Sequence, residues 1–174
     1  MINIRATPAP ATLDSPIDHL NACHRRIEER LDTLERVGPH LLTSTNEALA
    51  AIQSVFSFFD SSGVNHTADE ERSFFPRMAS RLTPEERQFL NDLENEHARA
   101  EAIYASLKSH VANMVRPPAA PDQIRYTELA AALCALYRQH IRNEDARFPA
   151  IANRSLSAAD LEAIAREMKR RRGL

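Results

Sequence analysis

Apolar residues recur at every third or fourth position along five segments of this chain, the spacing that one buried face of an α-helix produces. The first segment begins at Ser15-Pro16, a helix cap followed by proline at the first helical position, and it ends at Gly38-Pro39. His24 lies within its apolar stripe. The other members of that stripe are Ile17, Leu20, Ile27, Leu31, Leu34 and Val37.

The second segment begins at Ser44-Thr-Asn-Glu47, a predicted capping box, and its apolar face continues to Phe59. Residues 60–63 then interrupt the periodicity before His66. Two interpretations stay open: a break after which Asn65 caps a new segment, or one long helix that is distorted at this point. Helical character continues to about Arg81.

Thr83-Pro84-Glu85-Glu86 predicts the start of a long third helix, which ends before Pro117-Pro118 and carries His97 on its core-facing side. We expect Asp122 to cap the fourth helix, and a short fifth helix begins at Ser157. The pattern predicts an all-α fold, an up-down-up-down four-helix bundle with an extra short C-terminal helix. The bundle would span residues 15–152, between a flexible N-terminal arm at 1–14 and a C-terminal helix at 153–174 that packs on it.

Composition supports this prediction and narrows the class of function. Only 3 glycines and no tryptophan are present, which favours helix over sheet, and the net charge of 22 − 24 = −2 gives no general attraction for nucleic acid or membranes. The basic run 169–172 is interpreted as a solvated helix end. No signal peptide or membrane span is apparent, and Cys23 and Cys134 form no disulfide framework. We expect a soluble, cytoplasmic protein of undetermined oligomeric state.

Each of the four main helices carries one histidine at a core-facing position, and a glutamate follows every one of them four residues later. Residues at this spacing project from the same face of a helix. The pairs are His24/Glu28, His66/Glu70, His97/Glu101 and His140/Glu144. With 7 histidines and 15 glutamates in 174 residues, chance predicts roughly 0.6 such pairs, so four are a strong signal.

Carboxylates in a helical core are very unfavourable unless their charge is compensated, and a pair of divalent cations supplies that compensation. Mixed imidazole and carboxylate ligands suit iron, manganese or zinc, whereas the lack of inward thiolates argues against an iron–sulfur site. Helical bundles with inward Glu and His are a known architecture for two-metal sites. The pattern therefore predicts a dinuclear centre.

Residues 15–152 resemble the hemerythrin-like (HHE) cation-binding domains. The shared motifs are His24, His66-x-x-x-Glu70 with Phe75-Pro76, Glu96-His97, and His140-x-x-x-Glu144-Asp145 with Phe148-Pro149. The resemblance implies two non-heme iron ions, bridged by oxide or hydroxide, that bind or react with oxygen, peroxide or nitric oxide. It also implies that Glu70 and Glu144 bridge the ions. Iron storage or sensing without turnover is the alternative function.

The predicted metal ligands are His24, His66, Glu70, His97, Glu101, His140 and Glu144. Oxygen-carrying hemerythrins have a histidine where this chain has Glu101. Two ferrous ions with three glutamate ligands would have a net charge of +4 − 3 = +1. Such an anionic ligand set favours the ferric state, and hence oxidation or peroxide chemistry over reversible oxygen carriage. Asp145 is an alternative to Glu144 as the metal ligand. We favour Glu144 because a residue five positions after His140 lies about 140° away from it around the helix. Three alternatives stay open for Glu28: it orients an imidazole, lies on the surface or is itself a metal ligand.

Tyr104 and Tyr137 lie one helical turn from predicted ligands. They are either hydrogen-bond or electron donors near the metals, or core aromatics with satisfied hydroxyls. Cys23 is interpreted as a small packing residue, with redox sensing as the alternative. No Ser/His/Asp or Cys/His nucleophile pattern is present, so the metals would perform any chemistry. Whether the protein is an enzyme stays open.

Overall fold

The computed structural model describes residues 12–174, and every regular element in that range is helical, which confirms the predicted all-α class. No helix among these residues is long and apolar enough to cross a bilayer. The arm predicted for residues 1–14 lies almost wholly outside the described residues. The elements are α1 (Pro16–Val37), α2 (Thr45–Phe58), α3 (Val64–Asp69), α4 (Phe75–Met78), α5 (Pro84–Asn113), α6 (Ala120–Ser155) and α7 (Ala158–Arg171).

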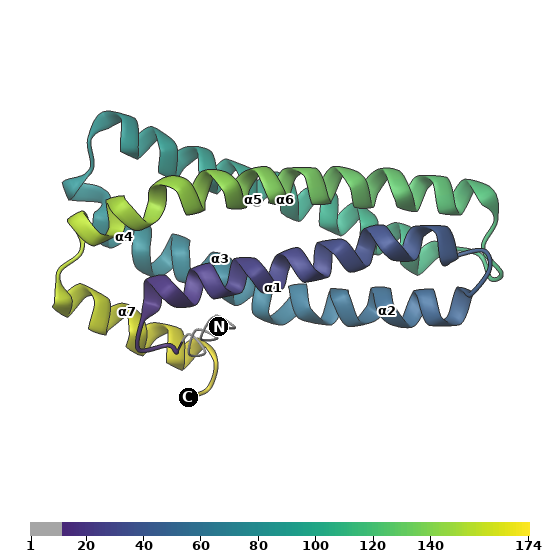
Figure 1. Cartoon of the computed structure of the whole chain (residues 1–174), viewed down its shortest axis with the longest axis horizontal. Coiled ribbons are helices and arrows are strands. Elements are labelled where there is room, and N and C mark those ends of the chain that lie inside the picture. The colour runs from purple at the N-terminus through teal and green to yellow at the C-terminus, as the bar shows by residue number, and fades with distance from the viewer. Residues whose placement is uncertain (1–11) are drawn as a thin grey trace, which may run out of the picture.

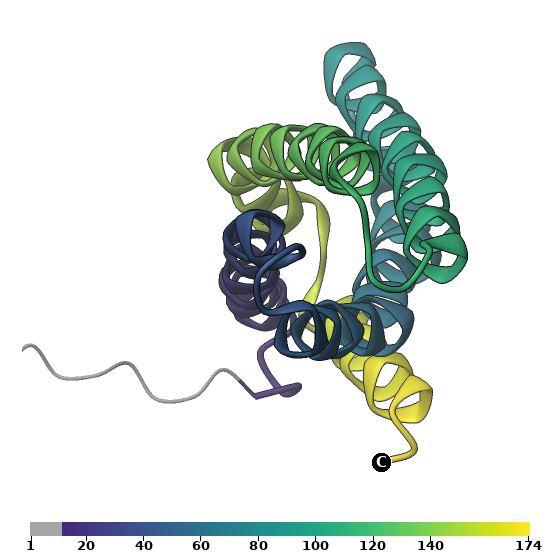
Figure 2. The same ribbon diagram turned by 90° about the vertical axis from the view of Figure 1, so that its right-hand side faces the viewer.

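Four long helical segments, namely α1, α2 to α4, α5 and α6, run along the same axis, and the chain turns at alternate ends of the molecule (Figure 1). Viewed from the end, α1 packs against α2 and α6, while α5 packs against α6 (Figure 2). The fourth side, between α3 and α5, holds an open cleft. The helix α6 continues past the domain boundary predicted at residue 152.

One continuous helix joins α2, α3 and α4. The interruption seen in the sequence falls in a π-helical turn at Phe59–Gly63, and a second π turn covers Glu70–Phe74. The alternative in which Asn65 caps a new helix is therefore wrong. Pro76 has no N–H and would collide with the carbonyl four residues earlier in a regular helix, which the wider turn directly before it relieves. Such turns are frequent at functional sites.

Only some of the helix caps predicted from the sequence are present in the structure. At Thr83 the predicted capping box is confirmed, because its Oγ1 accepts the Glu86 N–H at 3.2 Å and the Glu86 carboxylate accepts the Thr83 N–H at 2.9 Å. At Ser44 the predicted box was wrong, since this side chain makes no cap hydrogen bond. Asp122 is not the cap of α6 but lies inside its first turn, where its carboxylate accepts the N–H of Ala119.

The C-terminal helix α7 packs against α1 and α3 and is joined to α3 by ion pairs. Asp69, fully buried beside Glu70, accepts hydrogen bonds from Arg171 and Arg172, each at 2.7 Å. The interpretation of residues 169–172 as a solvated helix end was therefore wrong for these two arginines. Their contacts fix the turn of helix that carries Glu70.

Two apolar clusters fill the interior of the described residues, one toward the α1–α2 connection and one toward α7. The core-facing histidines lie between the clusters: His24, for example, falls between Leu20 of one and Ile27 of the other. A layer of polar side chains thus crosses the middle of the molecule. Its charges are far from water, so they need compensation within the layer.

Candidate metal centre

Six of the seven predicted ligands meet in this polar layer, and each is at most 9% exposed. Their nitrogen and oxygen atoms form two overlapping groups, within each of which the atoms lie no more than 4.8 Å apart. The first group comprises His24, His66, Glu70 and Glu144, and the second comprises Glu70, His97 and His140.

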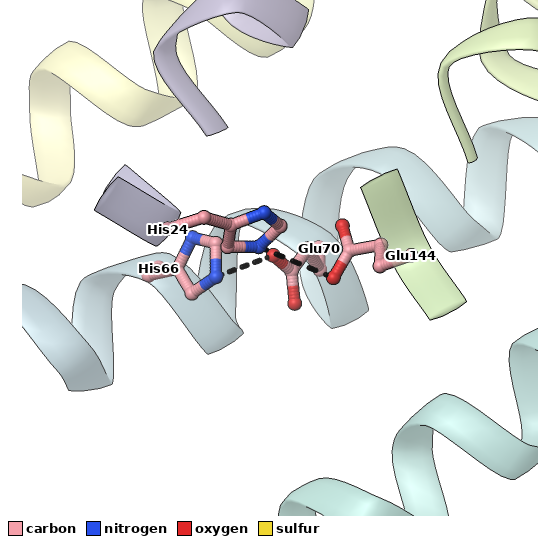
Figure 3. Close-up of side chains that lie close together, drawn as sticks. All are labelled: His24, His66, Glu70 and Glu144. Carbon is pink, nitrogen blue, oxygen red and sulfur yellow. Dashed lines mark ion pairs between the residues drawn. The ribbon is translucent and has the colours of Figure 1, made fainter. Parts of the chain in front are cut away.

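Figure 3 shows the first group, whose side chains point toward one another: His24 comes from α1, Glu144 from α6, and His66 and Glu70 from the continuous α2–α4 helix. The Nε2 atom of His66 lies 2.9 Å from Oε1 of Glu70, and Nε2 of His24 lies 3.3 Å from Oε2 of Glu144. The two imidazole rings meet edge to face with centroids 4.8 Å apart.

The second group shares Glu70 with the first, and its histidine His140 also lies close to Glu144. The Nε2 atom of His97 lies 3.1 Å from Oε2 of Glu70, and Nε2 of His140 lies 3.2 Å from Oε2 of Glu144. The two Nε2 atoms are 3.1 Å from each other. Each glutamate therefore contacts one histidine of each group, which is the arrangement that a bridging carboxylate requires.

The donor set fits a pair of divalent ions. Ligands about 2.1 Å from one ion, at angles between octahedral and tetrahedral, are about 3.0–3.4 Å apart, and the contacts above span 2.9 to 3.3 Å. In addition, Nε2 of His24 and His66 and all four carboxylate oxygens of Glu70 and Glu144 are buried without a properly oriented hydrogen bond to any described residue. Buried polar atoms rarely lack such partners.

Protonated imidazoles compensate the carboxylates when no cation does. Burial alone would lower the pKa of His24 and His97, but hydrogen bonds to neighbouring carboxylates outweigh it and raise each pKa to about 9. Burial likewise opposes ionisation of Glu70, yet the charge of His66 holds the pKa of Glu70 well below its usual range. A metal ion must displace protons from these imidazoles to bind.

Three of the four imidazoles are held from outside by a carboxylate of a neighbouring helix. The Nδ1 contacts are Asp145 with His24 at 2.6 Å, Glu71 with His97 at 2.9 Å and Glu96 with His140 at 2.9 Å. Such hydrogen bonds fix the ring so that Nε2 faces the centre. Each of these acids is the chain neighbour of a residue in the centre, a signal that a search for four-residue spacing does not detect.

The fourth imidazole, that of His66, has a thiol as its outer neighbour. Its Nδ1 atom is buried and has no well-oriented hydrogen bond to a described residue. Cys23 lies against it: burial raises the pKa of this thiol, but the charge of His66, the polar contact of the thiol with the His66 ring and the charge of Arg26 together outweigh burial and lower the pKa. Cys23 directly precedes His24 as Glu96 precedes His97, so a thiol occupies the place that a carboxylate takes on another helix.

Glu101 and Glu28 lie outside both groups. Glu101 is exposed and lines the cleft beside His97, so its ligation stays a prediction, and the charge argument built on it loses geometric support. With the six remaining ligands, two of which are glutamates, the net charge of a centre with two ferrous ions would be +4 − 2 = +2. Glu28 pairs with Arg138 at 3.3 Å. The orienting role considered for Glu28 is taken by Asp145, which stays outside the centre while Glu144 points inward.

The two tyrosines near the centre differ. The Tyr104 hydroxyl donates to the carbonyl of Phe56 at 3.1 Å and to Asp60 at 2.9 Å, as a satisfied core aromatic does. Tyr137 lines the cleft, and its hydroxyl makes no hydrogen bond to a described residue. Burial, together with the negative charges of Glu70 and Glu101, raises the pKa of Tyr137.

Comparison with known proteins agrees with this geometry. Residues 15–170 match the family described as the hemerythrin HHE cation binding domain, a range that contains every residue of both groups. The chain is also similar to an uncharacterized protein of Haemophilus influenzae, with 24% identity over 164 residues that cover 93% of this chain and 92% of that protein. The family match spans well over half of the sequence, and the chain therefore belongs to the hemerythrin HHE cation-binding domain family.

Proposed function

We propose that this protein is an up-down-up-down four-helix bundle that holds two iron ions and binds or reacts with oxygen, peroxide or nitric oxide. The proposal rests on one observation: Glu70 and Glu144 each contact one histidine of the first group and one histidine of the second. Membership of a cation-binding family supports the metal. Mixed imidazole and carboxylate ligation supports iron, with manganese or zinc as alternatives.

In this proposal each ion has its own pair of histidines. One ion would be held by His24 and His66 and the other by His97 and His140, with both glutamates shared. A pair of iron ions supplies the one-electron and oxygen chemistry that side chains lack. The chain orients the imidazoles through its outer carboxylates, and apolar clusters lie on either side of the centre. Two buried free cysteines fit the reducing cytoplasm, where we place the protein.

Anaerobic loading with ferrous iron tests the proposal. Metal analysis should find about two ions per chain, the number that two overlapping ligand groups imply. Exposure to air or peroxide should then produce the absorbance of ferric ions. Uptake of less than one iron per chain would overturn the proposal. Full loading without steady-state consumption of peroxide or nitric oxide would instead favour the storage or sensing alternative.

A further inference from the structure

The side of the molecule between α3 and α5 holds a half-open cleft of about 1010 Å³. On the other three sides α1 packs on α2, α1 on α6 and α5 on α6, and a smaller surface pocket of about 490 Å³ between α1 and α6 is lined by His24 and Asp145. Small side chains line the open side and leave room between the two helices. They are Gly63, Thr67 and Ala68 on one wall, and Ala98 and Ala105 on the other.

Two sets of contacts cross this cleft. On one side of it, Asp60 accepts hydrogen bonds from Tyr104 at 2.9 Å and from Lys108 at 2.7 Å. Elsewhere along it, Glu71 meets Nδ1 of His97 at 2.9 Å. Because His97 belongs to the metal centre and also lines the cleft, the cleft connects solvent with one half of that centre.

Tyr137 is the residue that α6 contributes to the lining. It lies one helical turn before His140, and its ring packs against Phe59 with centroids 5.4 Å apart. Its hydroxyl makes no hydrogen bond to a described residue and lies close enough to Glu70 to feel its charge. A hydroxyl on a partly buried tyrosine that has no hydrogen-bond partner among the described residues, beside the predicted metal centre and open to a cleft, is a donor available to a small molecule.

We propose that this cleft is the entry path to the metal centre and that the Tyr137 hydroxyl donates a hydrogen bond to the small ligand that arrives there. The inference rests on the proposed function and deepens it. It assigns ligand access to the side of His97 and His140, because His97 is 9% exposed in the larger cleft whereas His24, beside the smaller pocket, is 2% exposed. The ligand class is a molecule or anion of two or three heavy atoms with a hydrogen-bond acceptor, such as peroxide or azide.

Azide titration of the iron-loaded protein, followed by absorbance, tests the donor. Tyr137→Phe should weaken azide binding about five- to tenfold, the worth of one hydrogen bond. The matched control is Tyr126→Phe on the same helix, whose hydroxyl donates to the carbonyl of Leu34 at 2.9 Å away from the cleft. The control removes a buried hydrogen bond, so its stability should fall, but its azide affinity should change less than twofold. Equal affinity for Tyr137→Phe and the wild type would overturn the donor role.

Stopped-flow mixing with azide tests the entry path. Ala98→Phe places a large ring in the cleft from an exposed position and should slow azide association about tenfold or more without loss of iron. Ala102→Phe, also exposed on α5 but outside the cleft lining, is the control and should leave the rate unchanged. An unchanged rate in Ala98→Phe would overturn the entry path. A wild-type chain that binds no iron would overturn the proposed function instead.

Discussion

The two histidine pairs of the centre use the same kinds of ligand but meet the rest of the molecule differently. The enclosed half, His24 and His66, is 2–3% exposed, and its His66 ring lies against the thiol of Cys23. In the cleft half, His97 is 9% exposed and lines the cleft, while His140 is 3% exposed. In the cleft half, an outer carboxylate contacts Nδ1 of both His97 and His140. In the enclosed half, among the described residues, an outer carboxylate contacts Nδ1 of His24 alone.

The half of the centre with the more exposed imidazole is the half in which carboxylates hold both rings in orientation. Surrounding side chains restrict the enclosed rings, so packing itself limits their rotation. The cleft half lacks packing on one side, and the hydrogen bonds from Glu71 and Glu96 replace it as the restraint on ring orientation. Under the proposed function, we expect the enclosed half to retain its ion and the cleft half to meet incoming molecules, and the following changes test that division.

Removal of a shared carboxylate should have the largest effect because it affects both halves. Glu70→Ala should reduce iron to less than about half an ion per chain. Loading at about a thousand times Kd stabilises a fold by about 4 kcal/mol, or roughly 8–16 °C in Tm for a domain of this size, and this gain should disappear. Metal analysis and calorimetry measure both. The control Glu101→Ala should keep both ions, and two ions retained in Glu70→Ala would refute the bridge.

Loss of one histidine should separate the halves. His66→Ala and His97→Ala should each retain about one ion per chain, since each leaves one histidine pair intact. The azide spectrum should survive in His66→Ala and vanish in His97→Ala, because azide is expected to reach the cleft half. Metal content and azide titration of both variants provide the measurement. The opposite assignment of the azide response would reverse the proposed roles of the halves.

A smaller effect is expected from the outer carboxylates. Asp145→Asn removes the charged partner of His24 and should weaken iron binding about 10- to 100-fold, as measured by competition with a chelator. Glu28→Gln is the matched control because this acid pairs with Arg138 and not with an imidazole. If the control weakens binding as much as Asp145→Asn does, the assignment of the orienting role is wrong.

A separate effect, which does not involve the metal, is the pH dependence of the metal-free protein, in which both halves should behave alike. His24 and His97 have a pKa of about 9 in the folded chain, against about 6.5 when unfolded. Their contribution to stability is fully present below pH 6.5 and is lost as the pH rises through 9. The Tm of the metal-free protein should fall over this window, whereas that of the loaded protein should not. A rise in the metal-free Tm would contradict the shifts.

Much of the fold could be predicted from short-range patterns in the sequence. Apolar residues at helical spacing predicted the helices, and the cap at Thr83 is confirmed because its hydrogen bonds involve residues three apart. The continuity of the helix through residues 59–63 was not readable. A π turn and a break both interrupt the same periodicity, and only the backbone hydrogen bonds through Phe59–Gly63 distinguish them.

The centre divides in the same way. The sequence by itself determined that His66 and Glu70, or His140 and Glu144, share a helix face, because a four-residue spacing rotates by only about 40°. Tertiary structure alone decided which pairs stay inside. From His97, that rotation carries Glu101 into the cleft, since no helix closes that side, and from His24 it carries Glu28 toward Arg138. Likewise, the outer partners Glu71, Glu96, Asp145 and Cys23 act on histidines of other helices, and a pattern along one helix holds no information about its neighbours.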